Sequence, residues 1–108
     1  MEWSVETLNA TVDEELEALL SDMRARFVRI SELIAAVGID RVGGPHVRHL
    51  TGPLWEMRLT GRDGISRALY VATKDMSLVV VRVFFKKTRR TPRREIELAL
   101  RRAKEMMT

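Results

Sequence analysis

The chain has 108 residues, of which 45% are hydrophobic, and it contains few glycines and prolines. A chain of this size and composition folds into one domain, which we place at residues 1–108, and is not a disordered basic tail. Because it has no cysteine, disulfides, thiolate nucleophiles and zinc sites with cysteine ligands are excluded.

The net charge of +4 hides a polarised molecule. Residues 1–23 contain seven acids and no Lys or Arg, whereas residues 82–108 contain ten Lys or Arg against three acids. Such asymmetry indicates a polyanionic partner, most simply a nucleic acid. The first residues lack the features of a signal peptide, and no apolar run approaches the roughly 20 residues of a membrane span. We therefore expect a cytoplasmic protein that does not associate with membranes.

The first third of the chain predicts a short strand and two helices. Trp3, Val5 and Leu8 alternate with polar residues, which favours a strand over residues 3–8. Thr11 and Glu14 have the spacing of a capping box and are followed by leucines at helical intervals. Ser21 breaks this helix, and a second amphipathic helix continues from there to Gly38. The two helices form a hairpin suited to packing on a sheet.

The middle of the chain predicts three strands. Glycines and prolines bracket an irregular segment over residues 43–53. The run Leu54–Thr60 alternates cleanly, and a glycine-rich turn separates it from a second apolar run, Ile65–Thr73. The third strand begins at Leu78 and ends in a basic run that starts at Lys86. An apolar strand of this kind lies in a sheet, so its end holds the cations on a rigid edge.

A helix closes the chain. Thr91 and Pro92 predict its start, with the threonine as N-cap and the proline at the first helical position. The fold class is therefore α+β. We expect an N-terminal helical hairpin packed on a small antiparallel sheet of three to four strands, with a C-terminal helix.

Three segments, in this order, carry a family resemblance: LWEMRL, SRALYV and FFKKTRRTPRREIELALRR. The strongest signature is Lys86-Lys87-Thr88 at a strand end, followed by Thr91-Pro92 and the last helix. From about residue 11 to residue 107 the chain resembles the phage-derived HigB-type toxins of the RelE/ParE superfamily. One departure is that Arg82-Val83 stand where this family commonly has a His-Gly pair.

The resemblance implies a RelE-like fold and a function. Members of the HigB-type family are toxins of type II toxin–antitoxin systems that inhibit translation by cleaving mRNA in the ribosomal decoding site. They are silenced by a cognate antitoxin, often a helix-turn-helix protein such as a HigA-like one. For this chain the resemblance therefore implies a ribosome-dependent endoribonuclease that causes growth arrest.

RNA cleavage by a 2′-hydroxyl requires proton transfer and stabilisation of a charged phosphorane. Arginine and lysine suit the second task, and a lysine crowded by cations has a lowered pKa that suits the first. We expect a metal-free route without a cofactor. The resemblance aligns four positions with basic residues of the family, which we take as catalytic: Arg58, Arg67, Lys86 and Lys87. Five further cations are expected to bind RNA: Arg82, Arg89, Arg90, Arg93 and Arg94.

Simpler interpretations stand beside these. Arg67 can be a structural arginine paired with Glu56 or Asp75, and the basic run can be a solvated turn. Glu56 can be a pairing partner or a base. His46 and His49 are a poor basis for a metal site because no carboxylate or cysteine cluster accompanies them. A general acid–base role for His49 is a minor alternative.

Two other functions also fit the sequence. One is inhibition of DNA gyrase without nuclease activity, as in the ParE branch of the superfamily. The other is a non-catalytic nucleic-acid-binding module, which the absence of a stacking platform of aromatic residues on basic strands disfavours.

Overall fold

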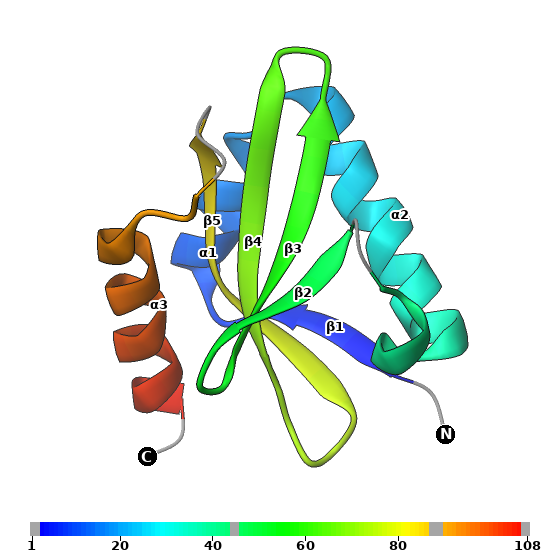
Figure 1. The fold of residues 1–108 in the computed structure, drawn as a ribbon, viewed down its shortest axis with the longest axis vertical. Helices are drawn as coiled ribbons and strands as arrows, with labels where there is room; N and C mark the ends of the chain where they lie inside the picture. Colours follow the sequence, from blue (N-terminus) through cyan, green and yellow to red (C-terminus); the bar gives the residue numbers. More distant parts are fainter. Residues whose placement is uncertain (1–2, 44–45, 87–89, 107–108) are drawn as a thin grey trace.

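A computed structural model describes residues 3–43, 46–86 and 90–106, with only the backbone of Lys86. Figure 1 shows a central sheet flanked by helices. The elements follow in the order β1 (Ser4–Thr7), α1 (Ala10–Glu17), α2 (Ser21–Val37), a 3-10 turn (Ile39–Arg41), β2 (Val47–Thr51), β3 (Leu54–Gly61), β4 (Gly64–Ala72), β5 (Ser77–Lys86) and α3 (Arg93–Met106).

The sheet has five strands in the order β1-β5-β4-β3-β2. Strands β2 to β5 form an antiparallel meander, whereas β1 pairs in parallel with β5, with Ser4 opposite Ser77. The α+β class is confirmed, but the expected antiparallel sheet of three to four strands is wrong in two respects. The sheet is mixed, and the segment expected to be irregular contributes β2 at its edge. The N-terminal strand lies within the predicted residues 3–8.

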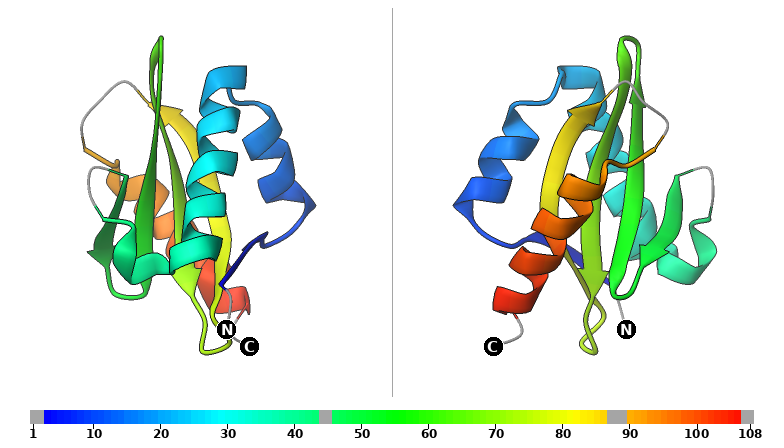
Figure 2. Two further views of the ribbon diagram at one scale, coloured as in Figure 1. Left: turned by 90° about the vertical axis from the view of Figure 1, so that its right-hand side faces the viewer. Right: turned by 60° about the vertical axis from the view of Figure 1, so that its left-hand side comes forward.

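Each face of the sheet has its own apolar core. Helices α1 and α2 lie together on one face, as Figure 2 shows, and pack on side chains such as Met57, Ala68 and Val83. Helix α3 lies along β5 and β4 on the opposite face, where Ala99 and Ala103 contact a second cluster. The helices of the described ranges include none that is long and apolar enough to cross a membrane.

The predicted helices form, but their first turns differ in detail from the prediction. Asn9, not Thr11, caps α1, and its side-chain oxygen accepts a hydrogen bond of 3.1 Å from the amide of Val12. The capping box was therefore placed two residues too late. The break at Ser21 is confirmed as the start of α2, and Gly38 follows its last residue with a φ of +85°.

Strand alternation decides which side chains share a face. In β3, Met57 and Leu59 join the core beneath α2, whereas Leu54 joins the core beneath α3, as the alternating pattern predicts. In β5 a bulge interrupts the register, because Tyr70 pairs with Val80 and Leu69 with Arg82. Val81 is the extra residue, and a bulge of this kind re-aims the side chains beside it.

Tyr70 lies in the core beneath α2 with no exposed surface. Its hydroxyl has no hydrogen-bond partner among the described residues, and burial raises the pKa of the phenol, so the group stays neutral. We predict that Tyr70→Phe leaves the free energy of unfolding unchanged or raises it by about 1 kcal/mol, because it removes an unsatisfied buried group. Urea denaturation measures this.

Tyr70→Ala is the matched control and should cost about 3–5 kcal/mol, since it leaves a cavity. A loss of more than about 1 kcal/mol in Tyr70→Phe would show that the hydroxyl has a partner.

Candidate functional site

Four charged side chains meet on the face of the sheet that also carries α3. Arg48 in β2 lies opposite Glu56 in β3, and Arg58 in β3 lies opposite Arg67 in β4. Directly opposed residues of an antiparallel pair project from the same face, and residues two apart in a strand do so too. Three strands therefore bring these groups together, and we call Arg48, Glu56, Arg58 and Arg67 the arginine cluster.

Glu56 is the centre of the arginine cluster. Its Oε1 atom lies 3.4 Å from the Nε of Arg48, 3.9 Å from the Nε of Arg58 and 3.5 Å from the Nε of Arg67. The side chains of Glu56 and Arg67 are 0% exposed, whereas those of Arg58 and Arg48 are 31% and 52% exposed. The cluster thus consists of a buried ion pair, Glu56 with Arg67, and two partly exposed arginines, Arg48 and Arg58.

The charges of the arginine cluster do not balance. Burial lowers the pKa of Arg67, the Glu56 carboxylate opposes that change, and the positive charges of Arg58 and Arg48 reinforce it. Three guanidinium groups sharing one carboxylate leave an excess of positive charge. Because Arg48 and Arg58 are partly exposed, this excess is available to an anion from solvent. A phosphate suits it, since arginine can present two N–H groups to two phosphate oxygens.

Thr91 joins the arginine cluster from outside the sheet. Its hydroxyl donates a hydrogen bond to Oε2 of Glu56. The sequence predicted Thr91 as the N-cap of the last helix, but the carbonyl of Pro92 instead accepts from the amides of Glu95 and Ile96. The helix begins at Arg93, one residue later than predicted, and the side chain of Thr91 contacts Glu56 in the arginine cluster.

The predicted catalytic residues are only partly placed by the structure. Arg58 and Arg67 come together around Glu56, and Arg67 has the Glu56 partner that its structural interpretation required. The backbone of Lys86 pairs with Ile65 at the end of β5, while its side chain and the whole of Lys87 lie outside the described residues. The catalytic roles of the four residues remain predictions.

Three of the predicted RNA-binding arginines are exposed in the described part of the chain: Arg90, Arg93 and Arg94. Arg93 is highly exposed and pairs with Glu97 one helical turn later. Arg94 is exposed and lines a hollow beside Glu15. Arg90 is exposed, and Arg89 lies outside the described residues. Their contact with RNA remains a prediction.

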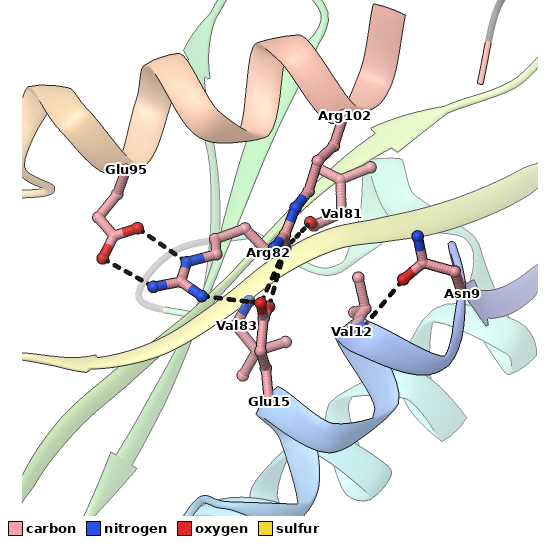
Figure 3. A network of polar contacts seen from close by, with 8 residues as sticks. All are labelled: Asn9, Val12, Glu15, Val81, Arg82, Val83, Glu95 and Arg102. Carbon is pink, nitrogen blue, oxygen red and sulfur yellow. Dashed lines mark hydrogen bonds and ion pairs between the residues drawn. The ribbon is translucent and has the colours of Figure 1, made fainter. Parts of the chain in front are cut away.

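Arg82, the fifth of these, is held by carboxylates on two helices (Figure 3). Its Nε and Nη2 donate to the two oxygens of Glu95 at 2.8 and 3.1 Å, and its Nη1 lies 2.8 Å from Glu15. These hydrogen bonds and charges raise the pKa of Arg82, so it stays charged. Arg102 binds the same Glu15 carboxylate at 2.9 Å. We call Glu15, Arg82, Glu95 and Arg102 the edge network.

The edge network closes the outer edge of β5. The pairing of β1 with β5 ends at Val80, and no described strand continues it along this edge. Beyond that point, side chains satisfy the backbone (Figure 3): the amide of Val83 donates to Glu15 at 3.1 Å, and Arg102 donates to the carbonyl of Val81 at 2.9 Å. The network thus ties α1 and α3 to β5 and covers backbone groups that a bare edge would leave open.

His49 lies outside the arginine cluster, whereas the carbonyl of His46 accepts a hydrogen bond of 2.8 Å from the amide of Arg58. His49 pairs with Trp55, and that pair belongs to the face beneath α2. Its Nε2 is 2.8 Å from the carbonyl of Gly52. In the described part of the chain, no group of three or more His, Asp or Glu residues is arranged to hold a metal ion.

Sequence reasoning missed Arg48 because it assigned that segment to a loop. The only available signal was the alternation of Val47, Arg48 and His49, which is too short to distinguish a strand from a turn. It also assigned Thr91 to a cap and left Glu56 as either a partner or a base.

The edge network yields a stability prediction. Glu15→Ala should lower the free energy of unfolding by about 2 kcal/mol, because it removes a partly buried acceptor shared by two arginines and a backbone amide. Chemical denaturation measures this. The matched control is Glu97→Ala, which breaks an exposed pair between helical neighbours worth only about 0.3–0.5 kcal/mol. Equal losses in the two variants would refute the structural role of the edge network.

The fold is similar to that of two solved RelE structures. It is similar to archaeal RelE in the RelE–RelB complex from Pyrococcus horikoshii OT3, with a TM-score of 0.62 and 20% identity over 83% of this chain and 100% of that one. It is also similar to a mutant of the E. coli toxin RelE in the free state, with a TM-score of 0.65 and 14% identity over the full length of both chains.

The sequence itself defines the family. Residues 14–104 match the family described as "Phage derived protein Gp49-like (DUF891)", and the chain belongs to it. No curated protein matches the sequence. The expected phage-derived family and the expected RelE-like fold are therefore confirmed.

Proposed function

We propose that this protein is the toxin of a type II toxin–antitoxin pair and that it acts as a HigB-type, ribosome-dependent mRNA endonuclease. Membership of the Gp49-like family and the RelE fold support the toxin assignment. The observation that carries the nuclease assignment is the excess positive charge of the arginine cluster on one face of the sheet.

In this proposal Arg58 contacts the scissile phosphate directly. Its side chain reaches solvent, and its Nε atom is buried without a hydrogen-bond partner among the described residues. A guanidinium in this position would stabilise the charge that develops on the phosphorane. Arg67 lies beneath it and adds positive potential without reaching the surface. Lys86 and Lys87 remain the proposed proton-transfer groups, because neighbouring cations would lower the pKa of either ammonium.

The proposed partners are ribosomal RNA, mRNA and an antitoxin. The exposed arginines that follow β5 would bind RNA phosphates, which gives an affinity that falls with salt. An antitoxin is proposed because archaeal RelE is solved in complex with RelB. A HigA-like helix-turn-helix protein with an acidic segment would fit the basic end of this chain.

Arg58→Ala tests the nuclease assignment. The variant should lose about 100- to 1000-fold in cleavage rate, the usual cost of removing one group that stabilises the transition-state charge. The measurement is mapping of transcript ends after incubation of mRNA with translating ribosomes, alongside a sample without ribosomes. The fold should survive, since the side chain is partly exposed.

Arg26→Ala is the matched control, because it removes the same charge from an exposed position on α2. Wild-type cleavage by Arg58→Ala would refute the site. Inhibition of gyrase supercoiling, with intact transcripts, would instead favour the ParE-like alternative.

A further inference from the structure

Glu56 is negatively charged and is therefore unsuited to contact RNA, yet it is the centre of the arginine cluster. A carboxylate repels phosphate, and burying one is costly unless it is paired and hydrogen-bonded. Here the carboxylate is completely buried. Its two oxygens divide their contacts: Oε1 faces the Nε atoms of Arg48, Arg58 and Arg67, and Oε2 accepts from Thr91. Because both carboxylate oxygens are occupied by protein groups, the geometry indicates that Glu56 holds the arginines and Thr91 in position.

We propose that Glu56 is the positioning residue of this site and that Thr91 assists it through the hydrogen bond that it donates to the Glu56 carboxylate. Glu56 orients the guanidinium groups, and through Thr91 it fixes the segment that precedes α3. This inference rests on the proposed nuclease function and assigns Glu56 a role different from that of a general base.

The geometry argues against proton abstraction by Glu56. A general base must come within hydrogen-bond reach of the proton that it removes. Glu56 has no exposed surface, and its Oε2 is already engaged by Thr91. Its Oε1 lies within 3.9 Å of the Nε atoms of three arginines. A substrate hydroxyl would have to displace these cations to reach it.

The ion pairs orient the arginines for an anion. Each of the three is made through Nε, so the carboxylate engages the inner edge of each guanidinium. The Nη groups of the two partly exposed members, Arg48 and Arg58, are left for phosphate oxygens. Among the described residues no hydrogen bond is seen at Oε1 of Glu56 or at the Nε of Arg58, so Glu56 orients these groups by charge attraction on the Nε side of each planar guanidinium.

Through Thr91, Glu56 also holds the chain where the basic run ends. The backbone of Lys86, at the end of β5, pairs with Ile65, and Thr91 is bound to the Glu56 carboxylate. These two described residues, one on each side of the basic run, are therefore attached to the strands that carry Arg67 and Arg58. A shift of about 1 Å in a catalytic group can cost about 100-fold in rate, so an anchor at this point matters for catalysis.

Thr91→Val and Thr91→Ser form the first test. Valine keeps the shape and removes the hydroxyl, so kcat for mRNA cleavage should fall on the order of tenfold with KM little changed, the expected cost of a hydrogen bond to a charged group. Serine restores the donor and should recover cleavage close to that of the wild type. Wild-type kcat in Thr91→Val, or no recovery in Thr91→Ser, would overturn the proposal.

Glu56→Gln separates positioning from acid–base chemistry. Glutamine keeps an oxygen acceptor but loses the charge, so kcat should fall by about 100-fold. The pH dependence of kcat should keep its shape, because the group that titrates is elsewhere. Loss of the acid limb of that profile would identify Glu56 as the base and overturn the proposal. If the variant does not fold, Glu56→Gln/Arg67→Met removes both buried charges and tests whether their pairing caused the failure.

A structural readout keeps this inference distinct from the proposed function. The Nε–H signals of the cluster arginines in the NMR spectrum should shift in Thr91→Val and return in Thr91→Ser. If the wild type cleaves no RNA with ribosomes, the proposed function fails, and these signals alone then decide whether Glu56 and Thr91 position the arginines. Unchanged signals in Thr91→Val would refute the positioning role in either case.

Discussion

The structure depends on a carboxylate and a guanidinium that are both fully buried in the sheet, Glu56 and Arg67. Neither could be buried alone, because breaking a buried ion pair costs about 3–5 kcal/mol, against a total stability of about 5–15 kcal/mol for a typical domain. Each therefore fixes the position of the other, and the pair links β3 to β4. Arg48 and Thr91 extend the link to β2 and to the start of α3.

Stability alone does not account for this arrangement. A buried ion pair can often be replaced by apolar residues of similar volume without loss of stability. A sheet made only to fold would not need three cations around one acid. Comparison with the edge network makes the same point: there, two arginines meet two carboxylates and their charges balance, and that network closes a strand edge. In the arginine cluster the charges do not balance, and Arg58 reaches solvent there, on the face that the proposal assigns to an RNA phosphate.

Much of the fold follows from local sequence. Periodicity predicted both N-terminal helices, the three long strands and the last helix, and it assigned Arg58 and Glu56 to the same face of β3. These features depend on residues close together in the chain. The alternation of apolar and polar residues is weaker in β2, which is short and flanked by glycines and prolines. Arg48 was therefore not predicted to lie on a strand or in the site. The start of α1 was misplaced because Asn9 and Thr11 are both good caps and only the folded backbone distinguishes them.

The contacts that the sequence could not predict are the distant ones. Glu15 and Arg102 are 87 residues apart, and Ser4 and Ser77 are 73 residues apart. Pairings of this kind depend on topology, and the local sequence around one residue does not indicate its distant partner. Arg82 was assigned to RNA for that reason, since its exposure could be judged only once α1 and α3 were placed.

The parallel pairing of β1 with β5 also has a kinetic consequence. Long-range contacts form slowly, since a large loop must close before they contribute any free energy. The first strand emerges early during synthesis but finds its neighbour only after most of the chain exists, and Thr91 follows later still. The contact between Thr91 and Glu56 is therefore the last contact of the arginine cluster that can form during synthesis. Under the function proposed above, the site would thus lack its link to Thr91 until the segment after β5 has been made, which would keep the nascent chain from acting on the ribosome that makes it.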